Sequence, residues 1–206
     1  MKWFYYVAWR FVRTVGYTLF GLKAVDEKNI PRTGPVLIAS NHQSYFDPPF
    51  VAVMIMREVH FFAKKELFDI PIMKRVITAL NAVPVRRGIY DPRSINKVFD
   101  VLSKGGGLIL FPEGTRGDGE TLLKPKPGIG LIAYKGKAPI VPAFAHRTHQ
   151  WSKSLFWRNR MSVTFGKPIT VEEILAYEDG KEGYRALSEE VMRRIKELKD
   201  KVLEKN

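Results

Sequence analysis

Short apolar runs alternate with helix-like segments along the chain from about residue 35 onwards. Runs rich in β-branched and aromatic residues predict strands over residues 36–40, 61–63, 82–85, 108–111, 140–143 and 162–165. Helices are predicted near residues 48–57, 65–79, 92–104 and 127–136 and over 184–205. Because strands and helices alternate in this way in α/β proteins, we expect a mixed, mostly parallel β-sheet flanked by helices on both faces.

The N-terminal segment interrupts this alternation with a cluster of aromatic residues. Eight of the first twenty residues are aromatic: Trp3, Phe4, Tyr5, Tyr6, Trp9, Phe11, Tyr17 and Phe20. On a helical wheel Lys2, Arg10 and Arg13 fall within about 80° of one another, so the segment is amphipathic. Its longest uncharged runs, 3–9 and 14–22, are much shorter than the roughly 20 apolar residues that cross a bilayer.

Aromatic rings favour the lipid headgroup level, and cationic side chains can reach lipid phosphates. We therefore expect residues 1–24 to lie in the membrane interface as an amphipathic motif of one or two helices, the second case requiring a break near Gly16. Residues 25–206 then form the α/β domain. The alternative is that the segment packs on its own domain as a core helix. A secretory signal is disfavoured because arginines interrupt the apolar stretch.

The composition favours anionic binding partners and excludes reactions that depend on cysteine. The 206 residues include 34 Lys and Arg against 21 Asp and Glu, and the net charge of +13 favours nucleic acid, phosphorylated metabolites or acidic lipid. A basic nucleic-acid-binding module is the competing class of function. However, the basic residues are spread along the chain without a known nucleic-acid-binding motif, so we expect no nucleic-acid partner. The absence of cysteine excludes disulfides, thiolate zinc sites and a cysteine nucleophile.

Polar clusters follow three of the predicted strands. The strand at 36–40 continues into NHQSYFD, the strand at 82–85 into Arg86 and Arg87, and the strand at 108–111 into PEGTRG. In an open α/β sheet, ligands bind outside the carboxyl ends of the strands. We therefore expect the three clusters to converge on one edge of the sheet.

His42 and Asp47 are the candidate catalytic pair. They would lie about 140° apart on an ideal helix, so a turn must bring them together. A carboxylate that binds one imidazole nitrogen leaves the other nitrogen free to accept a proton. The alternatives are that Asp47, which precedes Pro48, caps a helix and that His42 is structural. Because the chain has no Gly-x-Ser-x-Gly nucleophile motif, we expect the histidine to activate a hydroxyl of the substrate.

The glycine-rich turn after the strand at 108–111 suits a phosphate group. Arg116 can bind two phosphate oxygens at once, and Arg86 or Arg87 would approach from the neighbouring strand end. The predicted substrate-binding residues are Arg86, Arg87, Glu113, Gly114, Thr115, Arg116 and Lys126. Glu113 would orient Arg116 or a substrate hydroxyl. The alternative is an ordinary surface loop with no ligand.

We expect no metal and no bound cofactor. His146 and His149 form an H-x-x-H pattern with no third ligand nearby, and a solvent-exposed loop is the expected setting for them. The sequence GIGLIA at 128–133 matches a loose dinucleotide pattern, but no predicted strand precedes it.

Taken together, these motifs resemble those of the glycerolipid acyltransferases, which include the lysophosphatidate acyltransferases. NHQSYFD (41–47) matches the N-H-x-x-x-x-D motif, AVPVRRG (82–88) an arginine-ended block, FPEGTRG (111–117) a third motif and IVPAF (140–144) a proline motif. Their order and spacing agree over roughly residues 30–170. The second block has Arg86 where the family commonly has an aspartate. This leaves open which of Arg86 and Arg87 binds phosphate.

The resemblance implies transfer of an acyl group to the sn-2 hydroxyl of 1-acyl-sn-glycerol 3-phosphate (lysophosphatidic acid), giving phosphatidic acid. The donor would be an acyl thioester of coenzyme A or acyl carrier protein. His42 would be the general base, Asp47 would steady the imidazolium, and backbone N–H groups near Gly128 would stabilise the oxyanion. A related enzyme that uses another acceptor, such as glycerol 3-phosphate, is the nearest alternative. We expect the protein on the cytoplasmic face of the cell membrane, monotopic or peripheral, in contact with phospholipid.

Overall fold

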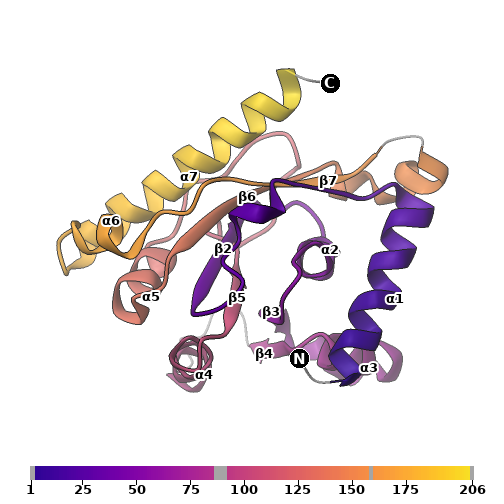
Figure 1. The fold of residues 1–206 in the computed structure, drawn as a ribbon, viewed down its shortest axis with the longest axis horizontal. Helices are drawn as coiled ribbons and strands as arrows, with labels where there is room; N and C mark the ends of the chain where they lie inside the picture. The colour runs from indigo at the N-terminus through magenta and orange to yellow at the C-terminus, as the bar shows by residue number, and fades with distance from the viewer. Residues whose placement is uncertain (1–2, 86–91, 158–159, 205–206) are drawn as a thin grey trace.

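The computed structural model describes residues 3–85, 92–157 and 160–204, and its core is a seven-stranded β-sheet (Figure 1). The strands are β1 (Lys23–Val25), β2 (Val36–Ser40), β3 (Val59–Lys64), β4 (Ala82–Val85), β5 (Gly107–Leu110), β6 (Ile140–His146) and β7 (Ser162–Phe165). Their order across the sheet is β1-β7-β6-β2-β5-β3-β4. All neighbouring strands are parallel except β6 and β7, so the expected mixed, mostly parallel sheet is confirmed.

Helices cover both faces of the sheet (Figure 1). On one face lie α1 (Trp3–Phe20), α2 (Asp47–Met54) and α3 (Pro71–Ala79). On the other lie α4 (Pro92–Ser103), α5 (Gly128–Gly136), α6 (Val171–Leu175) and α7 (Lys181–Glu204). Three 3-10 segments complete the fold: η1 (Glu27–Asn29), η2 (Lys65–Asp69) and η3 (Thr148–Trp157). Every predicted strand and helix has a counterpart here.

The helix predicted over 65–79 is divided into η2 and α3. Ile70 is extended, with φ −88° and ψ 113°, because the proline that follows it disfavours a helical conformation. Besides the 3-10 segments η1 and η3, one short strand and one short helix were not predicted. The three-residue strand β1 forms by parallel pairing with β7, and the five-residue helix α6 begins with a capping box between Thr170 and Glu173.

The central strands are apolar along their whole length because both of their faces are covered. In β2, Val36 and Ile38 face the core shared with α1, α2 and α3, whereas Leu37 and Ala39 face the core shared with α4, α5 and α7. Burial on both faces fixes the register of β2 against its neighbours, and thus the position at which each strand ends.

The N-terminal helix α1 is continuous through Gly16, so the motif consists of one helix. One face of it belongs to the core. The buried hydroxyl of Tyr5 accepts a hydrogen bond from Val59 N (3.2 Å), and Trp9 Nε1 donates to the carbonyl oxygen of Ile55 (3.1 Å). The core-helix alternative therefore holds for this face. The division of the chain at residue 24 stays a prediction.

Arg13 lies on the inward side of α1, although the helical wheel grouped it with Lys2 and Arg10 as a lipid-facing cation. It donates a hydrogen bond to the carbonyl oxygen of Val53 (2.9 Å), and its guanidinium lies 4.8 Å from the ring centroid of Trp9. Arg10 is exposed, and Lys2 lies outside the described residues. A helical wheel gives the angle between side chains but not which face meets the domain, so the role expected for Arg13 was wrong.

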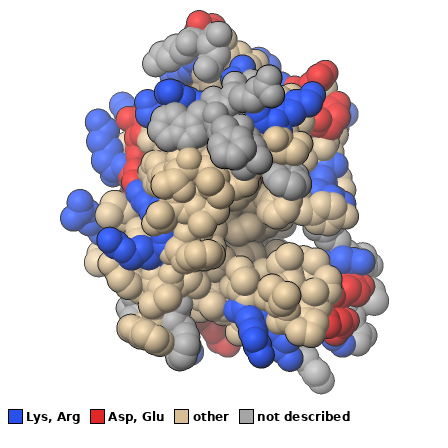
Figure 2. All heavy atoms as spheres, turned by 90° about the vertical axis from the view of Figure 1, so that its right-hand side faces the viewer, with Lys and Arg blue, Asp and Glu red and all other residues tan. Residues whose placement is uncertain are grey.

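The outward faces of α1 and α3 carry apolar side chains in contact with solvent. On α1 these are Trp3, Val7 and Phe11, and on α3 they are Ile72, Met73 and Val76. Figure 2 faces this side of the molecule and shows a broad area without charged side chains, with Lys and Arg near its margins. Within the described parts of the chain, none of the helices has both the length and the hydropathy that crossing a bilayer requires.

Candidate active site

Three adjacent strands end at the candidate site. β2 lies between β5 and β6 and is parallel to both, so the carboxyl ends of these strands meet at one edge of the sheet. The loop after β2 carries His42 and Asp47, the loop after β5 carries Glu113 and Arg116, and Thr148 follows β6. The expected convergence is confirmed for the clusters after β2 and β5. Arg86 and Arg87, predicted after β4, lie outside the described residues.

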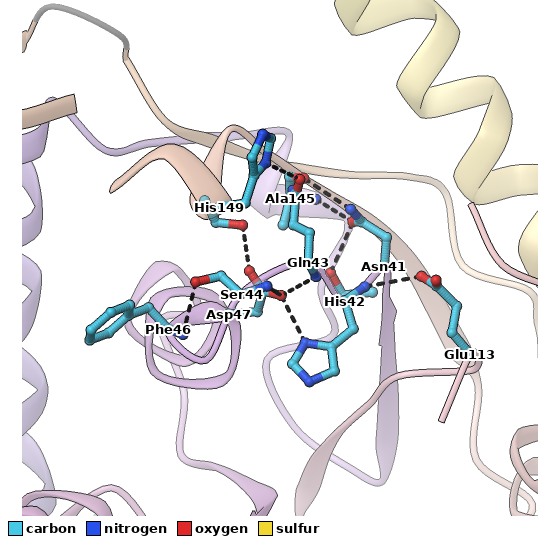
Figure 3. Close-up of polar contacts among 11 residues, drawn as sticks. Asn41, His42, Gln43, Ser44, Phe46, Asp47, Glu113, Ala145 and His149 are labelled. Carbon is cyan, nitrogen blue, oxygen red and sulfur yellow. Dashed lines mark hydrogen bonds and ion pairs between the residues drawn. The ribbon is translucent and has the colours of Figure 1, made fainter. Parts of the chain in front are cut away.

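The loop after β2 is bound to the end of β6 by two amide side chains (Figure 3). The side chain of Asn41 accepts a hydrogen bond from Ala145 N (2.7 Å) and donates one to Ala145 O (3.1 Å). Gln43 also donates to Ala145 O, and its Oε1 lies 2.7 Å from Nδ1 of His149. These contacts fix the backbone on both sides of His42.

His42 and Asp47 form a buried pair. His42 Nδ1 lies 2.8 Å from Asp47 Oδ2, and the same oxygen accepts hydrogen bonds from Gln43 N (2.6 Å) and Ser44 N (2.7 Å). His42 is 6% exposed and Asp47 is fully buried. Because an ionised carboxylate only accepts hydrogen bonds, Nδ1 carries the imidazole proton. Figure 3 shows the second ring nitrogen, Nε2, directed away from the carboxylate, where it can accept a proton.

The N-cap alternative for Asp47 does not describe its contacts. Asp47 is the first residue of α2, and its carboxylate turns back to the N–H groups of the preceding loop. Its position in the first turn nevertheless places the carboxyl group at the positive end of the helix dipole.

Glu113 joins the loop after β5 to the loop after β2. Its Oε1 accepts a hydrogen bond from His42 N (3.0 Å), and its Oε2 accepts one from Leu123 N (3.1 Å). Burial raises the pKa of this carboxyl group above its ordinary value, against the effect of the two hydrogen bonds. In addition, Gly117 N donates to His42 O (2.8 Å). Glu113 thus supports the backbone of His42, a role different from the predicted orientation of Arg116 or of a substrate hydroxyl.

The first residue of this second loop packs directly on the imidazole. The rings of Phe111 and His42 are stacked, with centroids 4.2 Å apart and planes inclined by 23°. The stacking contacts one face of the imidazole ring, whereas the hydrogen bond to Asp47 is made at the ring edge, so the two contacts together restrict the orientation of the ring. Sequence reasoning assigned no role to Phe111, Asn41 or Gln43, although all three lie in or directly beside the recognised motifs.

Arg116 is half-buried, and its neighbours Gly114 and Thr115 form an exposed part of the same loop. The guanidinium carbon of Arg116 lies 3.4 Å from the ring centroid of Tyr45, and its buried Nε has no hydrogen-bond partner among the described residues. Gly114 has φ 67°, and a Cβ there would lie 2.9 Å from Cδ of Lys126, so the lysine stem crosses the glycine. Thr115 and Lys126 are exposed. The structure thus groups these four predicted residues on one loop surface.

The H-x-x-H pair lies partly inside the protein. His146 is the last residue of β6 and is buried, whereas His149 is half-buried against Gln43. The expected solvent-exposed loop was therefore wrong, because β6 extends three residues beyond its predicted end. Burial lowers the pKa of His146 to about 4, with the charges of Arg147 and His149 adding to the effect. In the described ranges, no three His, Asp or Glu side chains are grouped so as to hold a metal ion.

Comparison with known proteins places this site in a family. The sequence profile described as "Acyltransferase" matches residues 21–145, which is more than half of the chain. The chain belongs to this acyltransferase family. The 1-acyl-sn-glycerol-3-phosphate acyltransferase of Bacillus subtilis is 33% identical over 183 residues, which cover 88% of this chain and 90% of the relative.

Two further matches agree with the family assignment. The 1-acyl-sn-glycerol-3-phosphate acyltransferase of Streptococcus pneumoniae is 29% identical over 79% of this chain and 60% of its own length. The crystal structure of the 1-acyl-sn-glycerophosphate acyltransferase PlsC from Thermotoga maritima superposes with a TM-score of 0.71 and 26% identity, covering 93% of this chain and 79% of that one. The acyltransferase resemblance and the α/β fold are thus confirmed.

The buried histidine of β6 predicts an acid-dependent loss of stability of this acyltransferase. The ordinary pKa of histidine is near 6.5, so between pH 6.5 and 4 the unfolded chain binds a proton that folded His146 does not. The free energy of unfolding should therefore fall by about 2 to 3 kcal/mol from this group as the pH drops through that range. In urea titrations at pH 7 and pH 4, His146→Gln should lose less stability than the wild type. Equal losses in both proteins would contradict the assignment.

Proposed function

We propose that this acyltransferase moves an acyl group from a thioester to the sn-2 hydroxyl of 1-acyl-sn-glycerol 3-phosphate, forming phosphatidic acid. The observation that carries the proposal is the buried His42–Asp47 pair at the end of β2, in a chain whose relatives bear that activity in their names. The donor is an acyl thioester of coenzyme A or of acyl carrier protein. No group bound to the protein is required for this chemistry.

The pair suits proton removal from an alcohol. Nε2 of His42 takes the proton of the sn-2 hydroxyl while that oxygen attacks the thioester carbonyl carbon. The tetrahedral intermediate then collapses, the carbon–sulfur bond breaks, and the imidazolium returns the proton to the departing thiolate. Asp47 stabilises the imidazolium between these steps and holds its ring in place. Neither step forms a covalent bond between the acyl group and the protein.

The oxyanion of the intermediate needs hydrogen-bond donors, which we assign to the start of α5. The N–H of Gly130 already donates to Ser188 Oγ (3.2 Å), which leaves those of Gly128 and Ile129 as the candidates in the first turn. Residues of the loop after β5 are connected to this turn, because Lys126 N donates to Pro112 O (2.8 Å).

Arg116 is the group that we assign to the acceptor phosphate. Its guanidinium lies over the Tyr45 ring, and the buried Nε, which has no partner among the described residues, is a donor that an anionic oxygen can satisfy. Gly117, the next residue, is bonded to the backbone of His42, so an anion bound by Arg116 is placed near the base. Lys126, Gly114 and Thr115 line the same exposed turn and complete the proposed phosphate contact, with Arg86 or Arg87 as an additional cation.

The side of the molecule formed by α1 and α3 is the surface that we assign to the membrane. Its exposed apolar residues lie near exposed cations, such as Arg10 on α1 and Lys74 and Arg75 on α3, a combination that fits anionic phospholipid. Tyr45, which lies against Arg116, is also exposed, so an aromatic ring beside the proposed phosphate loop is accessible as well. We therefore propose peripheral or monotopic association with the cytoplasmic face of the cell membrane.

Two substitutions separate the chemistry from acceptor binding. We expect His42→Ala to lower kcat by about 10²- to 10⁴-fold in a folded protein, because the positioned base is lost. Arg116→Ala should mainly raise KM for lysophosphatidic acid, with a much smaller effect on an acceptor that lacks the phosphate.

The assay follows the formation of phosphatidic acid and the release of thiol. The acyl donors are thioesters of coenzyme A and of acyl carrier protein, and glycerol 3-phosphate is tested as the alternative acceptor. A His42→Ala enzyme with a near-normal rate would remove the base assignment.

Membrane association is tested by substitutions on the exposed side chains, since deletion of α1 would also remove Tyr5 and Trp9 from the core. Phe11 and Ile72 are 68% and 78% exposed, and Leu203 at the end of α7 is a control that is 49% exposed. Phe11→Ser and Ile72→Ser should each weaken sedimentation with anionic phospholipid vesicles by about tenfold, because less apolar area enters the lipid. Leu203→Ser should bind like the wild type. Equal binding by all four proteins would refute this surface.

A further inference from the structure

The carboxylate of Asp47 is held on both of its oxygens, and the two sets of contacts come from distant parts of the chain. Among the residues that the structure describes, the partners of Oδ2 all come from the loop after β2: His42 Nδ1 and the N–H groups of Gln43 and Ser44. Oδ1 has one partner within the described ranges, the hydroxyl of Thr148, which is 101 residues away in sequence. Both residues are fully buried. The hydroxyl of Thr148 has a single proton, and that proton makes the hydrogen bond to Asp47.

The way the chain leaves β6 brings Thr148 to this position. β6 lies beside β2 and ends at His146, and the next residue, Arg147, has φ 61°. This left-handed conformation is uncommon for a residue other than glycine and persists where the surrounding structure requires it. It turns the chain into η3, of which Thr148 is the first residue.

A hydrogen bond to the second oxygen has two consequences for a buried carboxylate. It supplies the second oxygen with a hydrogen-bond donor in a place that water does not reach. It also fixes the plane of the carboxylate, because rotation about the last bond of an aspartate side chain is otherwise soft. Both consequences bear on His42, whose Nδ1 is bonded to the other oxygen.

We propose that Thr148 is a positioning residue that acts on His42 through Asp47. Its hydroxyl keeps the Asp47 carboxylate oriented, so that Oδ2 stays bonded to Nδ1 of His42 and Nε2 stays available to the substrate. The inference rests on the proposed function, because it takes His42 to be the base of the acyl transfer.

The first test compares three variants of Thr148 with one control. Thr148→Val keeps the shape and removes the donor, and it should lower kcat by about 10- to 100-fold with KM for both substrates unchanged. Thr148→Ser keeps the donor and should restore most of the rate. Thr148→Cys keeps a small side chain with a weak donor and should resemble Thr148→Val, which covers the case in which the valine variant fails to fold. Ser154→Ala removes another buried hydroxyl of η3, which bonds Gln150 O, and should leave kcat unchanged.

The second test observes the proton on His42 Nδ1 by NMR without any substrate. A proton shared with a buried carboxylate gives a downfield resonance, which should be present in the wild type and Thr148→Ser and shifted upfield or lost in Thr148→Cys and Thr148→Val. Folding is checked for each variant by thermal unfolding. An unchanged kcat or an unchanged resonance in a folded Thr148→Cys or Thr148→Val protein would overturn the inference, as would a serine variant as slow as the valine variant. The resonance does not depend on the acceptor, so failure of the proposed reaction would be seen separately, as a wild type that forms no phosphatidic acid.

Discussion

A fully buried carboxylate imposes the constraint on which the rest of the site depends. A charge removed from water must be surrounded by hydrogen-bond donors, and Asp47 obtains them from His42, from two N–H groups of its own loop and from Thr148. These donors come from segments that meet only when β2 and β6 lie side by side. The tertiary fold thus creates the conditions under which Asp47 can hold the imidazole.

The sheet supplies this arrangement through the order of its strands. Because β2 lies between β5 and β6, the histidine loop is supported on both sides, by Glu113 and Gly117 from one neighbour and by Ala145 from the other. The same arrangement keeps the cations of the loop after β5 on the outside of the site. A buried, fixed histidine and an outer loop to which we assign the acceptor phosphate therefore follow from one topology. The apolar sides of α1 and α3 add a surface suited to lipid.

The sequence was sufficient for six of the seven strands of the sheet, the fold class and the His42–Asp47 pair, because apolar runs mark buried strands and the polar residues directly follow them. Thr148 could not be predicted in the same way. Its partner is 101 residues away, and an isolated threonine after a strand has no distinctive spacing. Glu113 was found, but its partners are backbone N–H groups, which a sequence does not distinguish from nearby cations. Arg13 and His146 were misjudged because helix angles and strand propensities do not give tertiary burial.

The protonation pattern of His42 tests the central claim most directly. Nitrogen-15 NMR of the imidazole in the wild-type protein distinguishes the two neutral tautomers. Because the Asp47 carboxylate is bonded to the ring, we expect a proton on Nδ1 and a bare Nε2, and we expect loss of this preference in Asp47→Ala. A wild-type imidazole with its proton on Nε2 and a bare Nδ1 would contradict the proposed base.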